Sequence, residues 1–371
     1  MHKELSGVRK VAYTTIDDGS AYFQTALWTG NGGTQSITND GNSDLQPDFV
    51  WTKRRDTDGQ NHHVVDSSRG VTKTLVPNDT DTEATKSTGL TAFNSDGFSI
   101  GADANYNNNT ELYVGWQWKA NGGSRTTFTE SSNNPAGGYQ ANTTAGFSII
   151  DYTGTLGDSG GGSGTFAHGL NSAPTWWVVK PRVNVSDNQW FVCHQGFASD
   201  YATDFIHFDT TGAKQDNALM WNDTAPTNSV ITVGSKPGTN NDGSGFICYA
   251  WHDVQGFSKF GSYTGNGIIN GPVIYTGFKP AWIMIKCTSQ TEPWFIVDTK
   301  RSTTNPTNEA LVPNDSNTEN TTAGYNIDIL SYGFKCRGDS GQQNEDGGNY
   351  IYMAFAKHPL VSSKGVPVTA R

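Results

Sequence analysis

The chain has little of what builds long helices, spans membranes or directs secretion. Leucine and glutamate, which favour helices, are scarce. No apolar run reaches the length of a membrane span, and the opening residues, MHKELSGVRK, contain no apolar stretch of the kind found in signal peptides. We therefore expect a protein without signal peptide or membrane insertion, synthesised in a cytoplasm.

Cysteine and clustered positive charge are also sparse. The 371 residues include four cysteines, far apart within apolar runs and without C-x-x-C spacing, which predicts buried free thiols rather than zinc ligands or disulfides. They are Cys193, Cys248, Cys287 and Cys336. The net charge is -10 and the 25 basic residues are scattered, whereas phosphate binding needs clustered lysine and arginine. We expect no nucleic-acid partner.

Aromatic residues, glycine, asparagine, serine and threonine are abundant instead. Aromatic residues make up 12 % of the chain, and they fall in short apolar runs separated by polar loops. Such runs, bounded by Gly and Asn turns, are typical of strands, so we predict an all-β protein with little helix. Short strands with frequent turns favour antiparallel β-sandwiches.

One pattern occurs three times along the chain. A proline begins an apolar run that ends in lysine, at residues 47–53 (PDFVWTK), 174–180 (PTWWVVK) and 280–286 (PAWIMIK). An aromatic-Thr-Gly turn precedes each run, and an aromatic-rich segment follows it. A period of roughly 110 residues has the size of a domain, so we predict three related repeats in tandem.

The repeats divide the chain into six segments. We predict an N-terminal arm (1–20), repeat 1 (21–120), a Gly/Ser/Asn-rich linker (121–145), repeat 2 (146–255), repeat 3 (256–358) and a C-terminal tail (359–371). Almost nothing joins repeats 2 and 3, so these two should pack as one body.

The proline-launched runs predict which side of each strand is buried. The second and fourth residues after proline are large and apolar in every copy, and this face should form the common core. They are Phe49, Trp51, Trp176, Val178, Trp282 and Met284. The opposite face is more polar in repeat 1 than in the others, so we predict Val50 to be more exposed than Trp177 and Ile283.

Two kinds of charged residue recur with the repeats. Asp66 with Arg69, and Asp298 with Arg301, are predicted to form local ion pairs that fix the turn after a strand. Each proline-launched run ends in a lysine whose aliphatic stem should cover core aromatic rings while its charge reaches water. These lysines are Lys53, Lys180 and Lys286.

Catalytic motifs give little support to an enzyme. Residues 157–161 spell GDSGG, as around the nucleophile of trypsin-like proteases, but none of the eight histidines lies in a trypsin-like context to act as base. The carboxylates of laminarinase-like glycosidases are missing too, because no Glu-x-Asp-x-x-Glu occurs. We predict that the protein is not an enzyme.

Acidic loops contain the metal candidates. Oxygen ligands at alternate positions suit calcium, although such spacing arises often in a chain rich in Asp and Asn. The weak calcium candidates are Asp40, Asn42, Asp44 and Asp79, Asp81, Glu83. His62 and His63 have no third ligand at suitable spacing and are interpreted as surface or strand histidines. We expect no cofactor, with calcium as the alternative.

Most of the 11 tryptophans belong to core strands, but three flank loops. Exposed aromatic rings beside Asn and Asp are typical of sugar-binding faces, because the ring stacks on the apolar side of a sugar. The candidate ligand-binding residues are Trp190, Trp221 and Trp294. Burial in the core is the other interpretation of these rings.

Six strings together resemble the repeat of virion structural proteins from marine phages, which infect cyanobacteria and related marine bacteria. The strings are residues 26–38 (ALWTGNGGTQSIT), 46–55 (QPDFVWTKRR), 64–73 (VVDSSRGVTK), 93–101 (FNSDGFSIG), 145–154 (AGFSIIDYTG) and 256–267 (GFSKFGSYTGNG). The resemblance covers residues 22–359 and implies concanavalin-like or lectin-like β-sandwiches without established catalytic residues. The glycine loop at 157–164 and the cysteines depart from the pattern.

The resemblance implies a tail-fibre-like protein exposed on a phage virion, as a tail fibre, spike or capsid-surface appendage whose loops contact host glycans. Its partners would be other virion proteins and further copies of the chain, with trimers expected by analogy with fibres and spikes. A purely architectural protein, such as a capsid decoration or tail-assembly protein without host ligand, is the first alternative. A carbohydrate-active enzyme is the second.

Overall fold

Strands dominate the computed structural model, which describes residues 12–157, 161–198 and 200–367. Within these ranges the α-helices are three single turns, α1 (Ala104–Asn107), α2 (Ala218–Trp221) and α3 (Pro237–Asn240). No helix in the described ranges is long and apolar enough to cross a membrane. The prediction of an all-β protein with antiparallel sheets and little helix is confirmed.

Three antiparallel sheets, here called the inner sheets, share one strand order. In module 1 (residues 23–118) the order is β1 (Phe23–Thr29), β9 (Leu112–Trp118), β3 (Phe49–Arg54) and β4 (His62–Asp66). In module 2 (126–251) it is β12 (Phe147–Thr153), β19 (Gly245–Trp251), β14 (Trp176–Pro181) and β15 (Phe191–His194). In module 3 (258–359) it is β20 (Ser258–Thr264), β26 (Asn349–Pro359), β22 (Phe278–Cys287) and β23 (Phe295–Asp298).

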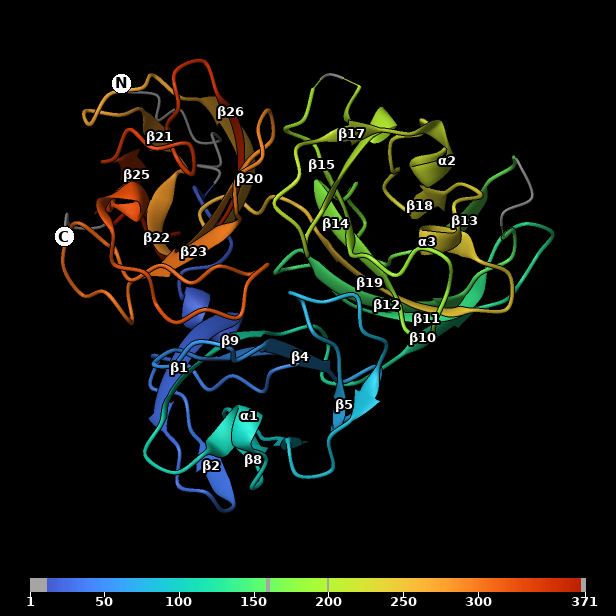
Figure 1. Cartoon of the computed structure of the whole chain (residues 1–371), viewed down its shortest axis with the longest axis horizontal. Helices are drawn as coiled ribbons and strands as arrows, with labels where there is room; N and C mark the ends of the chain where they lie inside the picture. The colour runs from blue at the N-terminus through green and yellow to red at the C-terminus, as the bar shows by residue number, and fades with distance from the viewer. Residues whose placement is uncertain (1–11, 158–160, 199, 368–371) are drawn as a thin grey trace, which may run out of the picture.

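A smaller outer sheet accompanies each inner sheet. These are β2 (Gln35–Ile37), β8 (Phe98–Ile100) and β7 (Leu90–Phe93) in module 1, β13 (Gly164–Ala167) and β18 (Val230–Val233) in module 2, and β21 (Val273–Tyr275), β25 (Gly333–Cys336) and β24 (Ile327–Leu330) in module 3. Module 1 also has the short pair β5 (Lys73–Thr74) and β6 (Ala84–Thr85). Figure 1 shows the three modules around a common centre, with the outer sheets at the periphery.

Strand register, as well as strand order, is the same in the three inner sheets. Phe49 pairs with Trp118 on one side and Asp66 on the other. Trp176 pairs in the same way with Trp251 and His194, and Trp282 with Phe355 and Asp298. Phe49, Trp176 and Trp282 therefore occupy equivalent positions, and so do the residues that follow them along each strand.

The apolar face predicted to form the common core does so across all three modules. Phe49, Trp51, Trp176, Val178, Trp282 and Met284 belong to one buried cluster. The Trp118 ring contacts Trp282 of module 3 at 5.6 Å between centroids and Trp251 of module 2 at 6.4 Å. Module 1 thus packs on both other modules, whereas the sequence predicted that only repeats 2 and 3 form one body.

The opposite face of these strands is equally buried in every module. Val50, Trp177 and Ile283 are each 0 % exposed, so the prediction that Val50 would be more exposed is wrong. Val50 packs with Phe98 and Ile100 of its own outer sheet. Both faces of each inner sheet are covered, because the outer sheet takes one face and the neighbouring modules take the other.

The segment expected to be a linker contains two strands. Its residues form β10 (Thr126–Phe128) and β11 (Ala136–Asn142), which extend the inner sheet of module 2 beyond β12. Tyr139 and Ala141 pack on the core of module 2, while the intervening Gln140 is buried and donates to Ser68 Oγ of module 1 at 2.7 Å. Only alternate residues are apolar, and the surrounding Gly and Asn hide this period in the composition. On the far side, β16 (Asp204–His207) and β17 (Gln215–Asp216) complete an eight-stranded sheet.

Candidate functional site

The most elaborate polar constellation joins the three modules to one another. Lys53, Lys180 and Lys286 occupy equivalent strand ends, and each ammonium donates to a carbonyl of a neighbouring module. Lys53 Nζ lies 3.4 Å from the Ser316 carbonyl, Lys180 Nζ 3.0 Å from that of Thr80, and Lys286 Nζ 3.0 Å from that of Thr211. The three contacts run from module 1 to 3, from 2 to 1 and from 3 to 2, and so close a ring.

Each lysine also donates to a carbonyl of its own module, those of Arg54, Asn188 and Glu292. All three side chains are 0 % exposed. The expectation that their charges reach water is therefore wrong, because loops of the neighbouring modules cover the strand ends. Burial disfavours the ammonium and lowers the pKa of each lysine to about 8.

Two of the three tryptophans proposed as ligand-binding residues, Trp190 and Trp294, also bond to a neighbouring module. Trp190, Trp221 and Trp294 are 3 %, 0 % and 0 % exposed, so they offer no ring face to a sugar. Trp190 Nε1 donates to the Val76 carbonyl of module 1 at 3.0 Å, and Trp294 Nε1 donates to the His207 carbonyl of module 2 at 3.0 Å. Trp221 bonds within module 2, to the Asp204 carbonyl.

His62 takes the corresponding place in module 1. Its Nε2 lies 3.0 Å from the Val312 carbonyl of module 3, and its Nδ1 accepts from Trp51 Nε1 at 3.0 Å. Burial holds the pKa of His62 well below its usual value, so the ring is neutral and uses both nitrogens. The neighbouring His63 is also buried and stacks on Tyr106, with centroids 5.1 Å apart.

The two predicted Asp–Arg pairs are confirmed, and each also contacts a neighbouring module. Arg69 Nε donates to Asp66 Oδ2 at 2.5 Å, and the same oxygen accepts from the Tyr249 hydroxyl of module 2 at 2.7 Å. Arg301 Nε donates to Asp298 Oδ2 at 2.6 Å, and that oxygen accepts from Trp116 Nε1 of module 1 at 3.0 Å. Both arginine and both aspartate side chains are fully buried.

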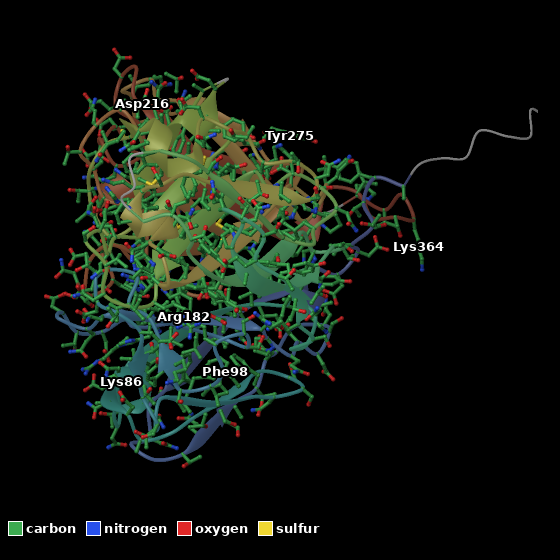
Figure 2. The ribbon with its side chains drawn as sticks, turned by 90° about the vertical axis from the view of Figure 1, so that its right-hand side faces the viewer. Lys86, Phe98, Arg182, Asp216, Tyr275 and Lys364 are labelled. Atoms are coloured by element: carbon green, nitrogen blue, oxygen red, sulfur yellow. The ribbon has the colours of Figure 1, made fainter. Side chains whose placement is uncertain are left out.

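A glutamate extends each of these pairs across the interface. Glu83 accepts from Arg182 Nε of module 2 at 2.9 Å and lies 3.4 Å from Arg69 Nη1. Glu319 accepts from Arg55 of module 1 at 2.9 Å and from Arg301 at 3.1 Å. Figure 2 shows Arg182 where module 2 meets module 1.

Three of the six calcium candidates, Asp40, Asp79 and Glu83, contact other groups of the protein. Glu83 is paired with arginines, as above, and Asp40 forms an ion pair with Lys300 of module 3. Asp79 Oδ1 accepts from the Thr80 amide at 2.6 Å. No group of three or more His, Cys, Asp or Glu side chains within the described part of the chain is placed to hold a metal ion.

Two other predicted features have plain outcomes. The four cysteines are buried and free, as the sequence predicts. The GDSGG string includes residues 158–160, which lie outside the described residues.

Among the described residues, a central cavity and a seam cavity lie where the modules meet. The central cavity measures about 40 Å³ and is lined by apolar core residues of all three modules, among them Trp51, Trp176 and Trp282. The seam cavity, between modules 1 and 3, measures about 340 Å³. Its wall includes Asp18, Gln24, Asp40, Lys300, Lys357 and His358. Its size falls in the range of small-ligand pockets, and its lining mixes both charges with amides and hydroxyls.

Residues 18–359 match the model of a family described as a domain of unknown function (DUF7483). The match spans most of the 371 residues, so the chain belongs to this family. No curated protein and no solved structure matches the chain.

Proposed function

We propose that this member of the DUF7483 family is a non-enzymatic structural protein of a phage virion, exposed on the particle as a tail fibre, spike or capsid-surface appendage. The virion assignment rests on the resemblance of the six sequence strings. The structural assignment rests on one observation: the buried lysines, aspartates, arginines and loop tryptophans bond the modules to one another.

Groups of these types would serve catalysis or ligand binding if they lined an open cleft. Here Lys180, Arg69 and Trp190 instead lie under loops of a neighbouring module or against its strands. A buried, hydrogen-bonded charge must be desolvated, and it is retained at an interface where it fixes one geometry. The arrangement supports a rigid building block, as a particle component has to be.

Between the architectural and the adhesive versions of this role, the burial of Trp190, Trp221 and Trp294 supports architecture, because adhesion rested on their exposure. Host-glycan adhesion is a second candidate, favoured by the seam cavity alone. A polyhydroxylated ligand could use its mixed donors and acceptors, such as Lys357 and Asn42.

The experiment that tests the proposal is localisation on purified particles by electron microscopy, with a gold-labelled antibody against the chain. We expect label on the outer surface of intact virions. Particles that carry no label and contain no chain by mass spectrometry would contradict the virion assignment.

Glycan arrays and host-adsorption assays separate the two versions. Binding that is lost in Lys357→Ala, but kept in Lys364→Ala at an exposed site outside the cavity, would establish adhesion. Absence of binding to cells and polysaccharides would leave architecture.

A further inference from the structure

Exposed apolar side chains are concentrated on the outer sheet of module 3. In the described ranges nine large hydrophobic residues are exposed, and five of them lie in or beside β21. We call this set the β21 patch: Ile268, Ile269, Val273, Tyr275 and Tyr332. Tyr275 is 58 % exposed and stacks on Tyr332, with ring centroids 6.2 Å apart. Figure 2 shows Tyr275 at the outside of the molecule, at the opposite end from Lys86 and Phe98 of module 1.

The patch lies on a free sheet edge. β21 is the outermost strand in the order β21-β25-β24. The Thr276 amide donates to the Tyr332 carbonyl at 2.9 Å, and the Cys336 amide donates to the Pro272 carbonyl at 3.2 Å. The even-numbered residues of this strand therefore bond to β25.

Backbone groups alternate in direction along an antiparallel strand, so the N–H and C=O groups of Val273 and Tyr275 point away from β25. Nothing in the described part of the chain forms a hydrogen bond with these four groups. Unpaired groups of this kind are a template for another strand.

The equivalent edges of modules 1 and 2 are built differently. Ile37, Phe166 and Ile274 are the equivalent buried residues, because they pair with Phe98, Ile231 and Phe334. The residues flanking them are Ser36 and Thr38 in module 1, Thr165 and Ala167 in module 2, and Val273 and Tyr275 in module 3. Only module 3 thus places large apolar side chains at both flanking positions.

Module 2 also caps its edge, since the Thr165 amide donates to the Asn134 side chain at 2.9 Å. Edges that stay in water are usually blunted by polar or charged residues or by a covering loop. Modules 1 and 2 follow this rule, and module 3 departs from it.

We propose that β21 is a docking edge for a second copy of this chain, which pairs with it antiparallel about a twofold axis at Ile274. In this register Val273 of each copy lies opposite Tyr275 of the other. Val273 of each copy then exchanges two backbone hydrogen bonds with Tyr275 of the other copy. All four free groups of each copy are therefore paired.

The strand is complementary to itself in its side chains as well. Each Val273 meets a Tyr275, and pairs of an aromatic with a β-branched residue stabilise neighbouring strands. The two outer sheets join into one continuous six-stranded sheet. A twofold contact of this kind uses the same surface in both copies and closes, so it yields a dimer and no fibre.

Sedimentation velocity over a concentration series tests the proposal. We expect the wild-type chain to dimerise, and Val273→Thr/Tyr275→Ala, which installs the residues of module 2, to weaken dimerisation at least about tenfold, equivalent to about 1.4 kcal/mol. Val183→Thr/Leu219→Thr removes exposed apolar residues elsewhere and should leave the dimer unchanged.

Three outcomes would overturn the proposal: a monomeric wild type at every concentration, a dimer that the β21 variant does not weaken, or equal weakening in both variants. If the wild type is monomeric and removal of residues 1–11 produces dimers, the chain's own N-terminal segment occupies the edge instead.

Cross-linking tests the register directly. Val273→Cys/Tyr275→Cys should oxidise to a covalent dimer, because opposite residues in a hydrogen-bonded pair lie about 5.5 Å apart at Cα, within disulfide reach. Ser36→Cys/Thr38→Cys, at the equivalent edge of module 1, is the matched control and should stay monomeric. The native cysteines are all buried and should not compete. Equal cross-linking in both variants would contradict the assigned edge.

Discussion

The interface between modules 2 and 3 differs in chemistry from the other two at an equivalent position. Asp66, Asp298 and His194 all pair with the second residue after a launching proline. The aspartates form buried ion pairs with arginine, at the 1–2 and 3–1 interfaces. His194 Nε2 instead lies 3.2 Å from the Tyr352 carbonyl of module 3. Burial lowers the pKa of His194 to about 4, so this contact is neutral.

The glutamates Glu83 and Glu319 also occur only at the two interfaces that contain an Asp–Arg pair, and Lys214 takes their place at the 2–3 interface. The Glu83 amide donates to the Arg182 carbonyl and the Glu319 amide to that of Arg55, while in module 2 the Lys214 amide donates to the Thr288 carbonyl. The backbone bond is therefore common to the three interfaces, and the charge network is not. Link length does not explain the difference, because residues 252–257 between β19 and β20 join modules 2 and 3, and the similarly short residues 119–125 between β9 and β10 join modules 1 and 2.

The largest expected effect separates the interfaces that contain an Asp–Arg ion pair from the 2–3 interface, which has His194 at the equivalent position. Asp298→Ala removes the nearer of the two carboxylates that pair with the buried Arg301, leaving Glu319, and should lower the free energy of unfolding by about 3–5 kcal/mol. His194→Ala leaves a neutral carbonyl unpaired and should cost about 1–3 kcal/mol. Urea unfolding measures both, with Asp216→Ala on the exposed β17 as control. Equal losses for Asp298→Ala and His194→Ala would end the distinction between the interfaces.

The aromatic N–H bonds, by contrast, should matter equally at both kinds of interface. Trp294→Phe and Trp190→Phe each remove a donor from a carbonyl of the neighbouring module and should cost about 1–3 kcal/mol for the lost bond. Trp282→Phe shrinks a similarly buried ring whose Nε1 has no hydrogen-bond partner among the described residues, so it serves as the packing control. The extra loss in free energy of unfolding, relative to this control, gives the contribution of the hydrogen bond. A difference at Trp190 but none at Trp294 would show that the 2–3 interface gains no stability from its tryptophan hydrogen bond.

The buried lysines predict that the free energy of unfolding rises with pH in alkaline solution. Burial lowers the pKa of Lys180 from 10.5 to about 8, so between these values the unfolded chain binds more protons than the folded one. The free energy of unfolding should then rise with pH by up to about 1.4 kcal/mol per unit for this lysine. Lys180→Met should remove that part of the slope, and the exposed Lys364→Met should not. Identical pH profiles for wild type and Lys180→Met would contradict it.

Local pattern predicted the parts of the molecule that depend on one repeat. The alternation around Phe49, Trp176 and Trp282 identified the shared core, because burial follows strand period. The Asp66–Arg69 pair was predictable because its two residues lie only three positions apart in the sequence.

The sequence of one repeat could not predict which of its residues a neighbouring module buries. Lys180 and Trp190 look like a strand end and a loop residue until residues 76–80 of module 1 lie over them. That contact joins positions about a hundred residues apart, and no local period records it. Val50 was misjudged for a different reason: its cover, β8, belongs to the same module but contributes only a short run to the sequence.

The smallest expected effect concerns the exposed rim of the 3–1 interface. Lys300 pairs with Asp40 across the seam cavity, but the Asp40 side chain is 70 % exposed. Water and salt screen such a pair, so Lys300→Ala should lower the free energy of unfolding by at most about 1 kcal/mol, and less in high salt. Urea unfolding at low and high ionic strength measures this. A loss as large as that of Asp298→Ala would mean that the rim, and not the buried Asp298–Arg301 pair, holds modules 3 and 1 together.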